Sequence, residues 1–174
     1  NRDSQAEVLI DAIDLRNKLE EIADAEYAKT GKYIRPIALF QAQPKGKEDA
    51  TTFEKLRDKL VDKGIPAEQI AIRTADVNEL KNADLMSPSC PIRYIITVNA
   101  LKEGWDCPFA YILASLANKT SQVDVEQILG RILRLPHTSQ HTQSALNMSY
   151  DFFQRLQQYC GAYRQGLEQR RFQR

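Results

Sequence analysis

Two arginines one helical turn apart give the chain its strongest candidate for anion chemistry. Residues 127–136 read Gln-Ile-Leu-Gly-Arg-Ile-Leu-Arg-Leu-Pro, and at about 100° per residue Gln127, Arg131 and Arg134 share one helix face. Neighbouring arginines repel one another unless an anion lies between them, and a guanidinium matches the geometry of a phosphate. Gly130 costs about 1 kcal/mol relative to alanine inside a helix, so it indicates close approach of another group. The alternative is a solvated basic helix face.

A second segment with candidate chemistry follows a β-branched, apolar run. Residues 101–108 read Leu-Lys-Glu-Gly-Trp-Asp-Cys-Pro. Gly104 permits a ligand to approach the backbone closely, and Pro108 fixes the direction in which the chain leaves. The carboxylate of Asp106 can accept hydrogen bonds from a ribose hydroxyl or from a partner arginine. Glycine and aspartate are also common turn residues, so a plain turn between two strands is the competing interpretation.

The elements that must position these segments alternate between strand and helix. Apolar periodicity and turn residues predict helices at 4–29, at about 52–61 (ended by Gly64), at 123–133 and at 151–174. Short apolar runs predict strands at 36–40, 70–72, 93–98 and 110–114, and residues 75–91 are expected to form a short helix followed by a loop. This order predicts an α/β domain with a mostly parallel sheet between helices. In such sheets ligands bind outside the carboxyl ends of the strands.

Length and composition are those of one globular domain. The 174 residues are 43% hydrophobic and 27% charged, and 24 Lys and Arg against 23 Asp and Glu give a net charge of +1. Nucleic acid must therefore be bound by a local surface, because the chain has no overall basic field.

Apolar runs are too short for a transmembrane helix. Three cysteines, with no signal peptide, favour a reducing cytoplasm. The absence of an initial Met suggests a piece of a longer polypeptide, and His137, Cys107 and Cys160 lack metal-ligand spacing, so no metal site is expected.

Taken together, the two segments resemble motifs V and VI of the superfamily-two helicases. The shared pattern is a strand, a Gly-x-Asp-x-Pro turn, a second strand and a Gln-x-x-Gly-Arg-x-x-Arg helix, in that order. More narrowly, the wording of residues 95–108 and of residues 79–88 resembles the Res subunits of type III restriction endonucleases. The resemblance extends over about residues 36–136. It implies a RecA-like helicase C-terminal domain at 32–150, preceded by a leading helix or linker at 1–31 and followed by a C-terminal helix at 151–174.

The resemblance also implies roles in ATP hydrolysis. ATP would lie between this domain and a first RecA-like domain, which supplies the phosphate loop and most of the contacts to Mg²⁺. Arg134 would be the arginine finger, Arg131 would assist it, and Gln127 would lie near the phosphates or the attacking water. On the nucleotide side the resemblance places Gly104, Asp106 and Gly130.

For nucleic acid, the resemblance implies a track along the strand ends. Polar side chains and backbone amides at strand ends suit sequence-independent contacts to phosphates. The implied residues are Gln41, Gln43, Arg73, Thr74, Thr97 and Asn99.

The implied partners are DNA, the first RecA-like domain of the same polypeptide and a methyltransferase subunit that supplies sequence recognition; no membrane is expected. Residues that form a restriction-nuclease centre are absent from the sequence. Two other functions remain open. One is a non-catalytic module that binds nucleic acid or protein through a helicase-like fold, and the other is half of an RNA helicase.

The 174-residue chain alone is expected neither to hydrolyse ATP nor to unwind nucleic acid. None of its seven glycines belongs to a Gly-x-x-x-x-Gly-Lys-Ser/Thr loop, and it has no Asp-Glu-x-His or Asp-Glu-x-Asp sequence. A phosphate-release assay on the purified chain, with and without DNA, tests this expectation. Turnover that disappears on Arg134→Ala substitution would contradict it.

Overall fold

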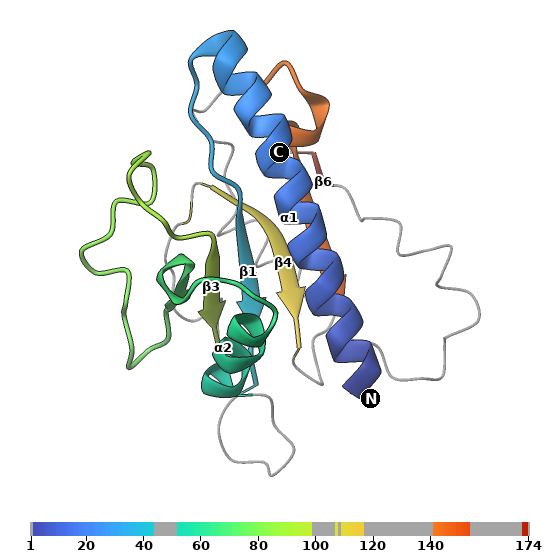
Figure 1. Ribbon diagram of the computed structural model, residues 1–174, viewed down its shortest axis with the longest axis vertical. Helices are drawn as coiled ribbons and strands as arrows, with labels where there is room; N and C mark the ends of the chain where they lie inside the picture. Colours follow the sequence, from blue (N-terminus) through green and yellow to red (C-terminus); the bar gives the residue numbers. More distant parts are fainter. Residues whose placement is uncertain are drawn as a thin grey trace.

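Five parallel strands and one antiparallel strand form a single sheet in the order β2-β3-β1-β4-β5-β6 (Figure 1). The computed structural model describes residues 2–43, 52–98, 107, 109–116, 141–153 and 172–173. The strands are β1 (Ile37–Gln41), β2 (Ile70–Ile72), β3 (Tyr94–Thr97), β4 (Ala110–Ser115), β5 (Met148–Phe153) and β6 (Phe172–Gln173), of which β6 is antiparallel. The expected α/β class with a mostly parallel sheet is confirmed, and this architecture is consistent with a RecA-like domain.

The first two helices lie close to where periodicity predicts them. The longer helix, α1 (Arg2–Thr30), stops before Gly31, whose φ of 74° favours glycine. The shorter helix, α2 (Phe53–Asp62), begins after Thr52, whose side chain accepts a hydrogen bond from the Lys55 N–H. It is followed by Gly64 with a φ of 90°. Two short 3₁₀ turns, η1 (Ala67–Gln69) and η3 (Ser144–Asn147), precede β2 and β5.

Helices α1 and α2 lie on the same face of the sheet, in front of the strands in Figure 1. They meet where Lys59 Nζ on α2 donates a hydrogen bond to Gln5 Oε1 on α1, at 3.1 Å. Tyr94 on β3 points toward this layer, because its hydroxyl accepts a hydrogen bond from Arg16 Nε. The helix predicted at 123–133 lies outside the described residues.

The sheet is deeply buried, which explains why its strands read as apolar runs rather than as alternating patterns. Ile37 through Phe40 of β1 have no exposed surface, and every residue of β4 is buried. Since both faces of such a strand are covered, both sets of side chains are apolar. The buried strand therefore supplies the core, and polar residues are confined to its carboxyl end.

The short helix expected within residues 75–91 is not present; the segment consists of turns. The buried guanidinium of Arg35 donates hydrogen bonds to three backbone carbonyl oxygens in and just after this segment. The acceptors are Leu85 at 2.6 Å, Ser87 at 2.9 Å and Ile92 at 2.7 Å. The Ser87 oxygen also accepts the Cys90 N–H at 3.1 Å, which closes a turn to the third residue along instead of a helical bond to the fourth. The distant arginine, rather than local helix propensity, thus shapes the segment.

The prediction of a final helix at 151–174 is wrong at both of the ends that the structure describes. Residues 151–153 belong to β5 and residues 172–173 form β6, so the domain boundary expected after residue 150 falls inside a strand. The β5 strand pairs with β4 in the register Ile112 with Tyr150 and Ala114 with Phe152. The β5 strand pairs with the backbone N–H and C=O groups along the free edge of β4. This gain outweighs the helix that the periodicity of the sequence favours.

The burial of α2 predicts a sharp difference between two adjacent residues. Leu60 is fully buried against the sheet, whereas Val61 is 43% exposed. Leu60→Ala is expected to lower the free energy of unfolding by about 2–5 kcal/mol, because the cavity adds to the lost transfer energy. Urea unfolding measures the change, with Val61→Ala as the control, expected to stay within about 0.5 kcal/mol. Equal losses from both substitutions would contradict this packing.

Candidate functional site

Four polar residues form a row across the carboxyl ends of four neighbouring strands. Gln41 at the end of β1 is in register with Thr97 of β3 and with Ser115 of β4. Arg73 extends the row beyond β2, since its N–H donates to the Ile96 oxygen at 2.9 Å in continuation of the parallel pairing. We call Arg73, Thr97, Gln41 and Ser115 the polar row.

The polar row lies on the face of the sheet opposite α1. Side chains alternate between faces along a strand, and Tyr94, three residues before Thr97 on β3, is bonded to Arg16 of α1. In-register residues of neighbouring strands share a face, so the whole row points away from that helix. Parallel topology therefore gathers Gln41, Arg73 and Thr97 at one edge, as the sequence predicts.

Gln41 carries an unsatisfied polar atom. Its Oε1 is buried and has no hydrogen-bond partner among the described residues. A buried acceptor without a donor costs about 1–3 kcal/mol, so this position favours a donor from a bound group. The carbonyl oxygen of Gln41 is engaged in the fold, since it accepts from the Leu116 N–H at 3.0 Å.

Gln43 has a structural contact where the sequence predicts a nucleic-acid contact. Its side chain is only 6% exposed, and its Nε2 donates a hydrogen bond to the Leu116 carbonyl oxygen at 3.1 Å. The amide group thus joins the chain beyond β1 to the chain beyond β4. Of the two glutamines considered for the strand edge, Gln41 retains an open acceptor.

Thr74 is likewise occupied by its own turn. Its Oγ1 accepts hydrogen bonds from the N–H groups of Val77 at 3.0 Å and Asp76 at 3.3 Å. Arg73 Nη1 donates to the Thr74 carbonyl oxygen at 2.5 Å. The residue is 6% exposed, so Thr74 shapes the turn that presents Arg73.

Glu79 closes this turn against the edge strand β2. Its Oε1 accepts the Ile72 N–H at 2.8 Å, while its own N–H donates to the Ile72 oxygen at 3.0 Å. An ion pair with Arg57 joins the same carboxylate to α2. The backbone groups of an edge residue are thereby satisfied, and the end of β2 is held in place.

Seven predicted residues lie outside the part of the chain that the structure describes. They are Asn99, Gly104, Asp106, Gln127, Gly130, Arg131 and Arg134. In the sequence they follow β3 and β4, the two strands that flank β1. The described residues fix the positions at which β3 and β4 end.

Sequence reasoning missed a buried carboxylate on α1. Glu26 is 1% exposed, and it accepts hydrogen bonds from the Thr142 N–H at 2.8 Å, from the Thr142 hydroxyl and from the Gln143 N–H. The Nδ1 atom of His141 lies 3.8 Å from its Oε1. The available signal is spacing, because Glu26 continues the buried stripe of α1 that includes Ala23.

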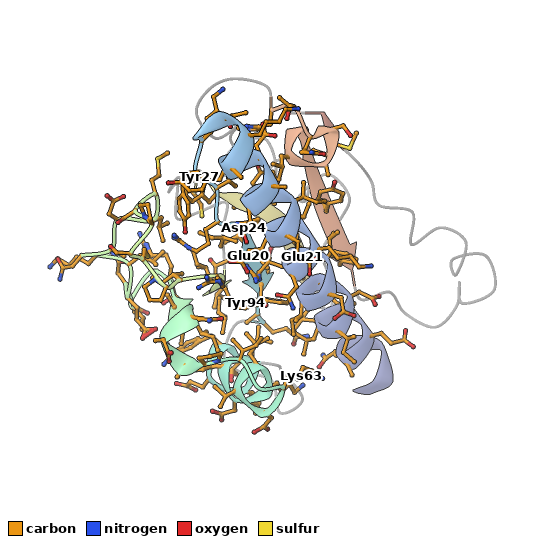
Figure 2. The ribbon with its side chains drawn as sticks, turned by 45° about the horizontal axis from the view of Figure 1, so that its top comes forward. Glu20, Glu21, Asp24, Tyr27, Lys63 and Tyr94 are labelled. Atoms are coloured by element: carbon orange, nitrogen blue, oxygen red, sulfur yellow. The ribbon has the colours of Figure 1, made fainter. Side chains whose placement is uncertain are left out.

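A second charged network fixes α1 across β3. The buried Arg16 donates to the Tyr94 hydroxyl at 3.1 Å, to the Pro36 oxygen at 3.1 Å and to Glu20 at 2.7 Å. Arg93 donates to the other oxygen of Glu20 at 2.9 Å; Glu20 and Tyr94 lie near one another in Figure 2. Burial opposes ionisation of Glu20, but the hydrogen bonds and charges of the two arginines lower its pKa overall.

The part of the chain that the structure describes contains neither a metal-ligand cluster nor a membrane-spanning helix. No group of three His, Cys, Asp or Glu side chains in these ranges is arranged to hold a metal ion. No helix among them has the length and hydropathy needed to cross a bilayer.

Comparisons with known proteins supply no identity for the chain. No family model matches it, and no curated protein matches it. The fold and the polar row therefore define only a class, an α/β domain with a polar carboxyl edge.

The Glu26 cluster predicts a specific pH dependence of stability. Burial opposes ionisation of Glu26, but hydrogen bonds from Thr142 and Gln143 lower its pKa below the ordinary value of 4.5. A lowered folded-state pKa stabilises the protein above the unfolded-state pKa, and this contribution is lost as the pH falls through the folded-state pKa. Glu26→Gln should thus cost stability at neutral pH, with the deficit narrowing in acid.

Urea unfolding over a pH series measures this deficit. The matched control is Glu21→Gln, at an exposed position of the same helix (Figure 2), which is expected to follow the unsubstituted protein. A deficit that stays constant, or grows, toward low pH would contradict an ionised and hydrogen-bonded Glu26.

Proposed function

We propose that this chain is the second RecA-like domain of an ATP-dependent DNA translocase of helicase superfamily two, similar to the Res subunit of type III restriction endonucleases. One observation carries the proposal. The strands β3 and β4, on either side of β1, end at the same sheet edge, and the two motif-bearing segments of the sequence come next in the chain after them. Motors of this class need both segments at one edge, where nucleotide and nucleic acid meet.

In this proposal ATP is the substrate and the arginines act on its phosphates. Charge on the transferring phosphoryl group must be neutralised by groups that are already in place. Arg134 is the arginine finger and Arg131 assists it, while Gln127 lies near the phosphates or the attacking water. Gly104, Asp106 and Gly130 belong to the nucleotide side. The first RecA-like domain supplies the phosphate loop and holds Mg²⁺.

The DNA track consists of Arg73 and Gln41 of the polar row together with Asn99. Arg73 brings a positive charge, and the side-chain amide of Gln41 brings N–H groups of the kind that phosphate oxygens accept. Thr97 and Ser115 are 0% and 1% exposed, so these two members of the polar row support it from within the sheet. Gln43 and Thr74, which the resemblance also implies, contribute indirectly through the chain that they hold. Such contacts suit the sugar-phosphate backbone, which carries no sequence information.

Sequence recognition is therefore assigned to a partner. By resemblance this partner is a methyltransferase subunit, and the motor works in the cytoplasm. ATP binding closes the cleft between the two RecA-like domains and hydrolysis reopens it, which advances one domain along the strand.

Arg134→Ala is the decisive substitution in the polypeptide that carries both RecA-like domains. Loss of an arginine finger is expected to lower kcat for ATP about 10³- to 10⁵-fold, with a much smaller change in nucleotide affinity. Steady-state ATPase assays and titration with a fluorescent nucleotide measure the two effects. Arg134→Lys keeps the charge but not the planar fork, so it should restore little.

Lys63→Ala removes a positive charge from an exposed position directly after α2 (Figure 2) and serves as the control. Unchanged turnover in Arg134→Ala would remove the arginine-finger assignment. The same assay with DNA and with RNA decides the polynucleotide: stimulation by RNA alone would favour an RNA helicase, and turnover that neither polymer stimulates would favour a binding module.

A further inference from the structure

The outer strand β2 is completed by a side chain from the turn that follows it. Among the described strands, β2 pairs only with β3. On its other edge the Glu79 carboxylate accepts the Ile72 N–H at 2.8 Å, and the Glu79 N–H donates to the Ile72 carbonyl oxygen at 3.0 Å. Glu79 therefore makes both of the hydrogen bonds that a neighbouring strand would make with Ile72.

The next residue along the chain, Arg73, is held from both sides. On the inner side its N–H donates to the Ile96 carbonyl oxygen at 2.9 Å. On the outer side it forms an antiparallel bridge with Asn78. The chain thus turns back alongside the end of β2, and Glu79 closes the turn from which the Arg73 side chain projects.

The Arg73 guanidinium has hydrogen-bond donors to spare. A guanidinium carries five N–H groups, and the one hydrogen bond that it makes among the described residues runs from Nη1 to the Thr74 carbonyl oxygen at 2.5 Å. Arg73 is half-buried, so part of its side chain reaches solvent. The planar fork that remains matches the geometry of a phosphate group.

The carboxylate of Glu79 is paired with an arginine other than Arg73. Its Oε1 accepts from Arg57 Nη2, and Arg57 belongs to α2, which lies on the same face of the sheet as α1 (Figure 1). The polar row, with Arg73, points to the opposite face. Arg57 therefore balances the carboxylate, and the charge of Arg73 stays available to an anion.

We propose that Glu79 is a positioning residue, which fixes the end of β2 so that Arg73 contacts a phosphate of the DNA backbone. The inference rests on the proposed function, since that function makes DNA the ligand. A carboxylate near DNA by itself weakens binding through repulsion, so Glu79 contributes through the main chain that it holds. Loss of its bond to Ile72 is therefore expected to weaken DNA binding, although a negative charge is removed.

Three substitutions test this sign in the polypeptide with both RecA-like domains. Glu79→Leu removes the acceptor of the Ile72 N–H, whereas Glu79→Gln removes the charge and keeps an amide oxygen as the acceptor. Arg73→Gln removes the phosphate contact itself. The control is Asp76→Asn, which removes an exposed negative charge from the same turn. Fluorescence anisotropy with a labelled DNA duplex, repeated over a salt series, measures the affinity and its dependence on salt.

Arg73→Gln and Glu79→Leu are each expected to lower the affinity about 10-fold, the effect of about one charge-assisted hydrogen bond. Each should also make the plot of log K against log salt shallower by about 0.9, the value for one phosphate contact on duplex DNA. The double substitution should lose no more than Arg73→Gln alone, because both changes remove the same contact. Glu79→Gln and Asp76→Asn should bind at least as tightly as the unsubstituted protein.

Unchanged or tighter binding by Glu79→Leu would overturn the positioning role, because loss of a negative charge alone predicts that result. Equal losses in Glu79→Leu and Glu79→Gln would overturn it too, since the bond to Ile72 would then be irrelevant. Circular dichroism checks that each variant is folded. If Glu79→Leu is not, Glu79→Asp takes its place, because it keeps the charge, shortens the reach to Ile72 and should show the same loss.

The same titrations separate this proposal from the function on which it rests. No DNA binding by the unsubstituted polypeptide would contradict the proposed function itself. Binding that Arg73→Gln weakens and Glu79→Leu does not would overturn only the role of Glu79. Binding that Arg73→Gln leaves unchanged would remove the contact assigned to Arg73, and the positioning role with it.

Discussion

The pairing of both edges of β1 is the constraint on which the other elements depend. This strand has β3 on one side and β4 on the other, and Ile37 through Phe40 are entirely buried. A strand that is covered on both faces and paired on both edges exposes no polar group to water before its end. Gln41 is therefore the first position along β1 where chemistry can be placed, and the polar row follows from its register with Thr97 and Ser115.

Three buried charged side chains then fix what surrounds this sheet. Arg16 joins α1 to β3, Arg35 donates to the carbonyl oxygens of residues 85, 87 and 92, and Glu26 holds residues 142–143. Each makes several hydrogen bonds, as a buried charge requires. Such contacts add directional geometry to an apolar core, because a hydrogen bond is sensitive to angle whereas burial of a methyl group is not.

The proposed motor uses this division between core and edge. Its apolar strands carry no chemistry and serve to bring strand ends together, while polar residues act only at the carboxyl edge. The contacts of Gln43 and Thr74 refine this picture, since each stabilises main chain that leads to a proposed functional residue. Residue types that suit phosphate binding equally suit hydrogen bonding to the backbone, and only the fold distinguishes the two uses.

The sequence by itself determined the local elements and the class of fold. Periodicity and glycine punctuation predict α1 and α2, and apolar runs predict the four strands β1 to β4, because these signals depend on neighbours within one element. Tertiary structure alone decided the turns at 75–91, the strand character of residues 151–153 and the burial of Glu26. In each case the deciding partner is remote in sequence: Arg35 for the turns, β4 for β5, and Thr142 for Glu26. A pattern within a short window does not contain such partners, so their effects become visible only when the chain is folded.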